Sequence, residues 1–412
     1  MPYCDVGGQQ SSPTIAAAAV APADAHLNND LKIFYRTYGH GPTKVLLIIG
    51  LAATHDAWGP QIKGLTGTSI PNDDDVVWSS GDDNEAGGGI EVCAFDNRGV
   101  GRSSMPFNKT EYSTTIMAKD AIALLDHLGW KKAHVFGHSM GAMISCKLAA
   151  MVPDRVLSLA LLNVTGGGFQ CFPKFDRQTF SVAYRFLRAK TPEERADVDL
   201  DTHYSQEYLE EYVGTDKRRT ILYQQYVKGI STTGMQPDYG FNGQLNACWT
   251  HKMTQTEIEA IKSAGFLVSV IHGRYDIIAQ IYHAKRLAER LQPMARMVDL
   301  HGGHLVSHER PEEVNQALFD LIKASLVKMN PHDWTNLPKQ ESWWNEKRVF
   351  FVRTNIQGGS NVSFKMCLLQ KLHLCLLFFF GLLVLAFESG RKLLRSLKPV
   401  PVANSPSYIE SQ

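Results

Sequence analysis

The segment Gly137-His138-Ser139-Met140-Gly141 follows the apolar run Ala133-His134-Val135-Phe136, and together these residues decide the fold. A serine separated by one residue from a glycine on each side is typical of a sharp strand-to-helix turn. The serine backbone is strained there, and only glycine leaves room for the neighbouring strand and helix. Residues 142–151 are expected to form the helix, which ends near Pro153 because proline cannot continue the hydrogen-bond ladder. This context predicts that Ser139 is a nucleophile.

Apolar runs and amphipathic helices alternate along most of the chain. Residues 44–49 form a continuous apolar run that ends at Gly50, which is typical of a strand buried on both faces. This alternation predicts an α/β fold with a doubly wound, mostly parallel sheet. Expected strands cover residues 31–38, 44–49, 91–95, 133–136, 156–162, 266–271 and 294–300, and expected helices cover residues 55–65, 113–128, 142–151, 280–291 and 311–327.

The region from residue 166 to residue 255 has a different character. It is rich in phenylalanine, carries charged helical stretches and lacks a buried-strand pattern, so we expect a helical insertion that covers the site. Its aromatic side chains either line a substrate pocket or pack the insertion onto the core.

The full organisation expected from the sequence has seven parts. These are a disordered N-terminus (1–27), the first part of the core (28–165), a helical cap (166–255), the second part of the core (256–328), a linker (329–365), a hydrophobic membrane-associated helix (366–390) and a basic and polar tail (391–412). The acidic stretch 71–89 is expected to be a solvated loop rather than a cation site.

The C-terminal hydrophobic helix is predicted from residues 374–387, an uncharged apolar run. As a helix this run is about 21 Å long, but with its flanks, and with Lys371 and Arg391 extending outward, it reaches about 28 Å. The hydrocarbon core of a bilayer is about 30 Å thick. The sequence therefore predicts a transmembrane anchor with the catalytic domain in the cytoplasm. The alternatives are a helix that lies in the membrane interface and a helix docked on the catalytic domain itself. Without membrane association, the expected location is the cytoplasm.

The overall composition excludes several classes of function. A net charge of +1 gives no electrostatic reason to expect a nucleic-acid partner. The seven cysteines include no Cys-x-x-Cys pair, so we expect reduced thiols and neither a zinc site nor a disulfide framework. Residues 1–25 lack the basic start and apolar core of a secretory signal. We expect no metal and no cofactor.

A nucleophilic serine needs a base within hydrogen-bond reach and an acid that orients the base. In this sheet topology the partners follow later strands in the order serine, acid, histidine. Asp276 and His304 each come just after an expected buried strand and beside glycines. His301 is a nearby alternative base, whereas Asn163 lacks the negative charge that stabilises an imidazolium. We therefore expect a triad of Ser139, Asp276 and His304.

The oxyanion that develops during acyl transfer needs two preplaced donors. We expect them to be the backbone N–H groups of Met140, which opens the helix after the serine, and Leu51, which follows the apolar strand. The glycine-containing segment Asp96–Ser103 lacks the Gly-Lys-Ser/Thr ending of a phosphate loop, so a structural turn is expected there.

Taken together, these motifs resemble those of the α/β-hydrolase fold superfamily. The matching segments are Gly137–Gly141, Asp96–Ser103, His272–Asp276 and Gly303-His304, with Glu309 and Pro311-Glu312-Glu313 behind them. The resemblance implies that Ser139, Asp276 and His304 form the triad and that the insertion is the family's cap.

The chain departs from the family pattern at two positions. It has Ile49-Gly50 where the family often has His-Gly, so it lacks a residue that commonly braces the oxyanion loop, and no proline follows Asp276. Neither departure removes a catalytic group.

The function expected from these residues is serine-dependent hydrolysis of a carboxylic ester through an acyl-enzyme. A small-molecule substrate is expected, or a lipid-like ester if the chain is anchored to a membrane. Two alternatives stay open: a ligand receptor with little or no catalysis, since the fold does not fix function, and an acyltransferase. Chemistry through an aspartyl ester is disfavoured because position 139 is serine.

Overall fold

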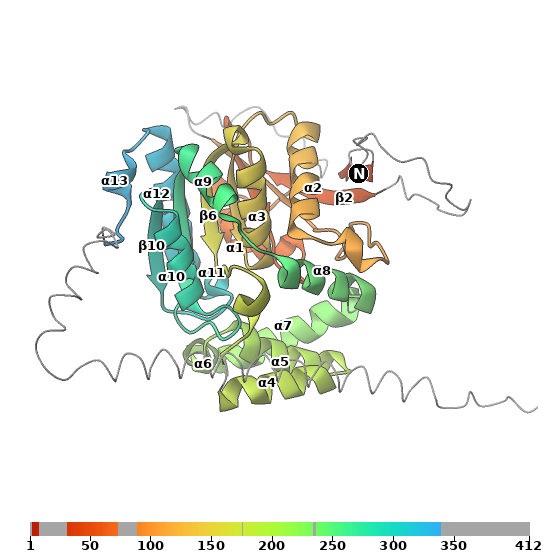
Figure 1. The fold of residues 1–412 in the computed structure, drawn as a ribbon. Helices are drawn as coiled ribbons and strands as arrows, with labels where there is room; N and C mark the ends of the chain where they lie inside the picture. The colour runs from red at the N-terminus through yellow and green to blue at the C-terminus, as the bar shows by residue number, and fades with distance from the viewer. Residues whose placement is uncertain (1, 8–30, 73–88, 175, 234–235, 339–412) are drawn as a thin grey trace, which may run out of the picture. The chain divides into compact units, whose positions relative to one another are not determined.

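A single mixed sheet forms the centre of the described chain (Figure 1). The computed structural model describes residues 2–7, 31–72, 89–174, 176–233 and 236–338. In spatial order the eight strands of its main sheet are β1 (Tyr3–Asp5), β2 (Lys32–Tyr38), β4 (Ile90–Phe95), β3 (Thr43–Ile48), β5 (Ala133–His138), β6 (Val156–Leu162), β9 (Leu267–Gly273) and β10 (Ala295–Leu300). The ladders from β4 to β10 are parallel, whereas β1 and β2 are antiparallel. The prediction of a mostly parallel sheet is therefore confirmed.

Helices cover both faces of this sheet, as expected for a doubly wound fold. One face packs against α2 (Thr114–His127), α3 (Met140–Met151), α9 (Gln255–Ser263) and α10 (Ile281–Arg290). The other packs against α1 (Gly59–Thr66), α11 (Val306–Glu309), α12 (Pro311–Leu326) and α13 (Pro331–Trp334). Short 3-10 turns are η2 (His55–Trp58), η3 (Lys109–Glu111), η4 (Pro153–Arg155) and η5 (Gly168–Cys171).

The central strands are apolar throughout because both of their faces are buried. In β3, Leu46 and Ile48 belong to the hydrophobic cluster on one face of the sheet, while Val45 and Leu47 belong to the cluster on the other. Successive strand side chains point to opposite faces, so a strand between two helical layers needs apolar residues at every position. Burial on both faces therefore explains the continuous apolar run of residues 44–49.

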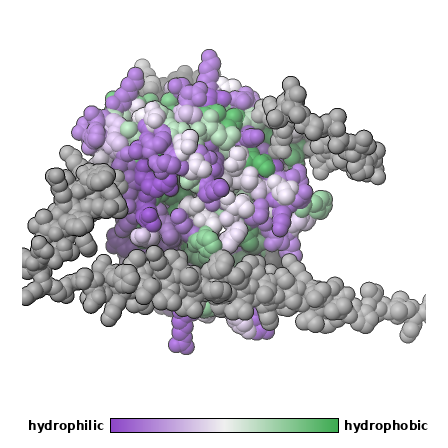
Figure 2. All heavy atoms as spheres, in the orientation of Figure 1, coloured by the Kyte–Doolittle hydropathy of each residue, from purple (hydrophilic) through white to green (hydrophobic). Residues whose placement is uncertain are grey.

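Helix α10 illustrates how the outer layer meets water. Ala284, Leu287 and Ala288 are buried, whereas Lys285 and Arg286 are exposed. This spacing of three and four residues places one apolar stripe on the sheet and leaves charged side chains outside. Figure 2 shows the hydrophilic surface that results over this part of the molecule.

A group of helices lies between β6 and β9. It comprises α4 (Arg177–Arg188), α5 (Pro192–His203), α6 (Gln206–Glu210), the hairpin β7 (Tyr212–Val213) and β8 (Asp216–Lys217), α7 (Arg218–Thr233) and α8 (Asp238–Thr250). In Figure 1, α4, α5, α6 and α7 gather at the lower end of the sheet, and α8 lies closer to the core. Leu200, Tyr204 and Leu209 form a separate small core here.

The ends of the described chain correct two expectations. Residues 3–5 were expected to be disordered but form β1, because Cys4 is buried and pairs with Ile33. The expected linker from residue 329 begins with α13, whose Trp334 is buried and donates its indole N–H to the Val268 carbonyl at 2.8 Å. Beyond α13, the side-chain amide of Asn336 bonds both the N–H and the carbonyl of Met297, at 2.9 and 2.7 Å.

The prediction of a membrane-spanning helix is corrected. Among the described residues, no helix combines the length and apolar character needed to cross a bilayer. Residues 366–390, on which that prediction rested, lie outside the described residues, as do the tail 391–412 and most of the acidic stretch.

Candidate active site

Ser139 occupies the sharp turn between β5 and α3. Its backbone has φ 54° and ψ −118°, a strained conformation for a residue with a β-carbon. The flanking glycines are needed for close approach. A β-carbon on Gly137 would lie 2.4 Å from the Gly141 carbonyl oxygen, and one on Gly141 would lie 2.0 Å from the Ile48 carbonyl oxygen. The turn lifts the serine to the carboxyl ends of the parallel strands.

Three loops bring Ser139, His304 and Asp276 into one hydrogen-bonded chain. His304 Nε2 lies 3.1 Å from Ser139 Oγ, and His304 Nδ1 lies 2.7 Å from Asp276 Oδ2. His304 and Asp276 are buried, while Ser139 is partly exposed. The imidazole can therefore take a proton from the hydroxyl on one side while a carboxylate holds its other nitrogen.

The surroundings of Asp276 keep its carboxyl ionised. Burial by itself raises the pKa, but the charge and hydrogen bond of His304, with contributions from His272 and Asn163, outweigh burial and lower the pKa of Asp276 to about 2. Its Oδ1 also accepts the N–H groups of Ile278 and Ala279, both at 2.8 Å. These bonds orient the carboxylate toward His304.

The other histidines considered from the sequence have different partners. His301 packs its ring against Tyr275, with 4.7 Å between ring centroids. His138 is buried and donates from Nε2 to the His304 carbonyl at 2.8 Å. Burial lowers the pKa of His138 to about 3, so this imidazole is neutral and supports the backbone of His304.

The two backbone groups expected as oxyanion donors belong to segments that adjoin Ser139. Met140 follows it in the chain, and Leu51 follows Gly50, whose added β-carbon would lie 3.1 Å from Ser139 Cβ. Within the described residues, neither the Met140 N–H nor the Leu51 N–H has an intramolecular acceptor.

The Asp96–Ser103 segment is a structural turn, as its sequence predicts. Asp96 Oδ1 accepts the backbone N–H of His55 at 2.8 Å, and Asn97 Nδ2 donates to the Ile49 carbonyl at 2.7 Å. Arg98 is buried and forms a two-pronged ion pair with Asp120, with both bonds at 2.6 Å. These side chains are committed to holding neighbouring loops.

Two residues near the triad were missed as contributors. Asn163 is not an alternative acid, and its Nδ2 instead donates to Asp276 Oδ2 at 2.7 Å. His203, at the end of α5, stacks on His304 with 6.2 Å between ring centroids and an interplanar angle of 25°. The positive φ of Asn163 (49°) has no sequence signature, and His203 belongs to no motif.

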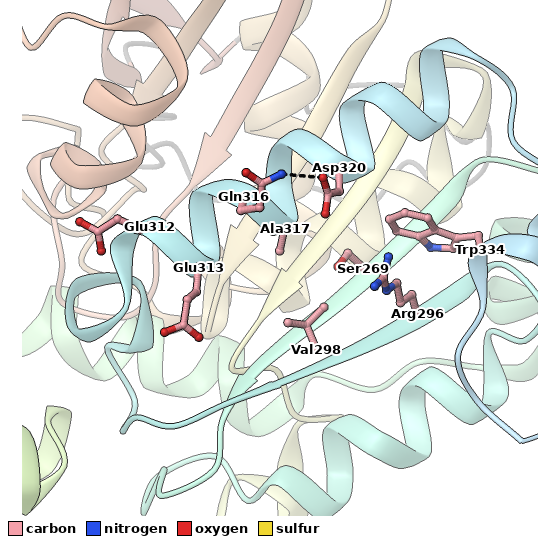
Figure 3. Close-up of a pocket in the computed structure, with 9 residues that line it drawn as sticks. All are labelled: Ser269, Arg296, Val298, Glu312, Glu313, Gln316, Ala317, Asp320 and Trp334. Atoms are coloured by element: carbon pink, nitrogen blue, oxygen red, sulfur yellow. Dashed lines mark hydrogen bonds between the residues drawn. The ribbon is translucent and has the colours of Figure 1, made fainter.

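A groove of about 470 Å³ lies elsewhere, between α12 and the strands β9 and β10 (Figure 3). Figure 3 shows acidic side chains of α12 on one side and Arg296 with Trp334 on the other. None of the triad residues lines this groove, whose strand residues Ser269, Arg296 and Val298 precede the loops that carry Asp276 and His304.

The fold and this arrangement at the strand ends define a class of protein, and comparison with known families agrees. The chain belongs to the alpha/beta hydrolase fold family, whose model matches residues 44–311. It is thus a hydrolase of the α/β fold.

Individual relatives have low sequence identity to this chain, but the aligned regions cover most of each relative. "Putative carbamate hydrolase RutD" of Azorhizobium caulinodans is 25% identical over 293 residues, which cover 70% of this chain and 94% of the relative. "Putative non-heme bromoperoxidase BpoC" of Mycobacterium tuberculosis is 28% identical over 240 residues, 57% of this chain and 85% of that protein. The crystal structure of an enol-lactonase from Burkholderia xenovorans LB400 covers 71% of this chain and 97% of its own at 21% identity, with a TM-score of 0.54.

Proposed function

We propose that this protein is a serine hydrolase that cleaves a carboxylic ester through a covalent acyl-enzyme. The observation that carries the proposal is the continuous relay from Ser139 Oγ through His304 to Asp276, with hydrogen-bonding distances of 3.1 and 2.7 Å. Hydroxyl, imidazole and carboxylate in this order are what activation of serine requires.

The first half-reaction forms the acyl-enzyme. Ser139 Oγ attacks the carbonyl carbon of the ester while its proton moves to His304 Nε2. The carbonyl electrons move onto oxygen, which receives the N–H groups of Leu51 and Met140. The C–O bond to the leaving group then breaks, and the proton on His304 passes to the departing alkoxide.

Water completes the reaction on the same atoms. His304 takes a proton from a water molecule while the water oxygen attacks the acyl carbon. The bond between Ser139 Oγ and the acyl carbon then breaks, the carboxylic acid leaves, and His304 returns the proton to Ser139 Oγ. Asp276 stays ionised, stabilises the imidazolium and maintains the tautomer that presents Nε2 to the serine. The low pKa of Asp276 supports this role.

We further propose that helices α4–α8 act as a cap over the substrate. Support comes from His203 of α5, which stacks on His304, and from the small core around Leu200 that packs against Leu305, next to His304. A cap of this kind selects substrates by shape and excludes water during acyl transfer. The curated relative named for carbamate hydrolysis makes carbamates a useful second acyl class to assay beside esters.

A fluorophosphonate probe tests the proposal directly. We expect stoichiometric labelling of the folded protein and hydrolysis of p-nitrophenyl esters graded by chain length, with both activities lost in Ser139→Ala. Loss of a catalytic serine removes about 10⁶-fold in rate. The control is Ser145→Ala on α3. Ser145 Oγ donates to the Gly141 carbonyl at 2.8 Å and, within the part of the chain that the structure describes, has no hydrogen bond to Ser139, His304 or Asp276.

The other outcomes distinguish the alternatives. Folded protein that neither labels nor hydrolyses any ester or carbamate would overturn the enzyme proposal and favour a ligand receptor. Labelling at Ser139 with product formed only when an alcohol or amine acceptor is supplied would instead identify an acyltransferase.

A further inference from the structure

The oxyanion loop lacks the histidine that commonly braces it in this family, so other side chains must hold it. Residues 50–52 follow β3, and Ala52 has φ 60°, a left-handed conformation that costs a residue with a β-carbon about 1 kcal/mol or more. Such a conformation persists only where the surroundings enforce it. The contacts of this loop therefore identify what replaces the missing brace.

Gln244 of α8 supplies the decisive contact. It is fully buried, and its Oε1 accepts the backbone N–H of Ala52 at 2.9 Å. Its Nε2 donates to the Arg98 carbonyl at 2.9 Å. One amide thus links the residue after Leu51 to the rigid Asp96–Ser103 turn, with both ends of the amide paired.

Gln236, just before α8, reinforces this bridge. Its Nε2 donates to the Gly99 carbonyl at 2.6 Å and lies 3.2 Å from Gln244 Oε1. The buried Gln244 amide holds the two loops at a fixed separation. Breaking its hydrogen bond to either loop leaves a buried polar group unpaired, which costs about 1–3 kcal/mol. The oxyanion loop is therefore held by the helical insertion rather than only by the sheet.

We propose that Gln244 is a positioning residue that sets the direction of the Leu51 N–H through Ala52 and so couples the docking of α8 to stabilisation of the oxyanion. This inference rests on the proposed function, since it assigns Leu51 as an oxyanion donor. It makes the insertion part of the catalytic geometry as well as a cover for substrate.

The test replaces Gln244 by methionine, which conserves volume and removes the hydrogen bonds of Gln244 to Ala52 and Arg98, together with the weaker one from Gln236. We expect kcat for a p-nitrophenyl ester to fall about 10- to 100-fold with KM nearly unchanged, since a donor displaced by a fraction of an ångström weakens transition-state binding more than ground-state binding. The rate of fluorophosphonate labelling should fall in parallel.

Asn246→Ala is the matched control on the same helix. Asn246 Nδ2 donates to the carbonyls of Lys109 and Tyr112, so it also ties α8 to the core through backbone acceptors but does not contact the oxyanion loop. We expect this variant to keep kcat within about twofold of the unmodified protein. Equal losses in both variants would mean that α8 docking, not Gln244, is responsible, and would overturn the inference.

A second variant keeps the inference testable if Gln244→Met does not fold. Gln244→Glu retains an acceptor for the Ala52 N–H but places its other oxygen against the Arg98 carbonyl, so its labelling rate should lie between those of the unmodified protein and Gln244→Met. Either folded variant labelling at the unmodified rate, while Ser139→Ala does not label, would overturn the role of Gln244 and leave the hydrolase proposal standing. Absence of labelling in the unmodified protein would instead contradict the proposed function.

Discussion

Asn163 is an uncharged residue that contacts the carboxylate of the proposed triad. Its side chain reaches from the end of β6 to Asp276, and its Nδ2 also lies 3.2 Å from the Gly303 carbonyl, next to His304. A hydrogen bond to a carboxylate favours the ionised form. Asn163 therefore helps to keep Asp276 charged and correctly oriented.

Paired substitutions separate this contribution from the backbone strain at position 163. Asn163→Gly and Asn163→Ala both remove the amide, so we expect kcat to fall about tenfold in each, equivalent to about 1.4 kcal/mol. Only alanine keeps a β-carbon at φ 49°, so its free energy of unfolding should be about 1 kcal/mol lower than that of the glycine variant. Ester hydrolysis and urea denaturation measure the two effects. Unchanged kcat in both variants would contradict the role of the amide.

Among elements, the short helices α6 and α11 meet through one buried carboxylate. Glu309 Oε1 accepts the N–H groups of Ser205 and Gly303, at 2.8 and 2.7 Å, and its Oε2 accepts the Ser205 hydroxyl at 2.6 Å. Gly303 directly precedes His304, and Ser205 caps α6. The carboxylate thus joins the insertion to the histidine loop.

Glutamine and alanine at position 309 should behave differently. In Glu309→Gln the Ser205 hydroxyl can turn to accept from the new amide, so we expect kcat within about threefold of the unmodified protein. Glu309→Ala leaves buried N–H groups without an acceptor at about 1–3 kcal/mol each, so kcat and the thermal midpoint should both fall. Steady-state kinetics and thermal unfolding check this expectation, and an alanine variant as active and stable as glutamine would refute it.

The elements also show what the sequence could predict and what it could not. Strands such as β3 and β9 are recognisable because burial on both faces demands continuous apolar runs. β1 is only three residues long and pairs across a long intervening segment, so no local pattern reveals it. The sequence allows Ser139, Asp276 and His304 to be predicted as site residues because each follows an expected strand. In the structure, Ser139 and Asp276 each lie within hydrogen-bonding distance of His304. Gln244 and His203 lie in the helical insertion, where no periodicity or motif indicates which side chain faces the site.

At the scale of the whole molecule, buried histidines make stability depend on pH. Burial lowers the pKa of His134 to about 4 and those of His138 and His251 to about 3. An unfolded histidine titrates near 6.5, so below that pH the unfolded chain binds protons that the folded chain does not. The contribution of these neutral histidines to the free energy of unfolding is therefore fully present above about pH 6.5 and is lost as the pH falls toward their folded pKa values of about 3–4.

His134 gives the cleanest test of this dependence. Its Nδ1 lies 2.8 Å from Ser158 Oγ, a contact that the uncharged amide of His134→Gln can imitate. Below pH 6.5 we expect the free energy of unfolding of this variant to fall less steeply than that of the unmodified protein, by about 1.4 kcal/mol per pH unit. Urea denaturation between pH 7 and 5 measures both slopes. The exposed His332→Gln is the control, and identical slopes for all three proteins would contradict the assignment.

The side-chain amide of Asn336 has a consequence for how molecules of this protein can meet. Exposed outer strands can recruit a strand from another chain, which is a common route to aggregation. At β10 the amide satisfies the peptide N–H and C=O of Met297 much as a ninth strand would. The residues that follow α13 therefore protect this edge of the sheet. At Met297 the backbone N–H and C=O are already paired, so a strand from another copy of the protein cannot begin an intermolecular ladder there.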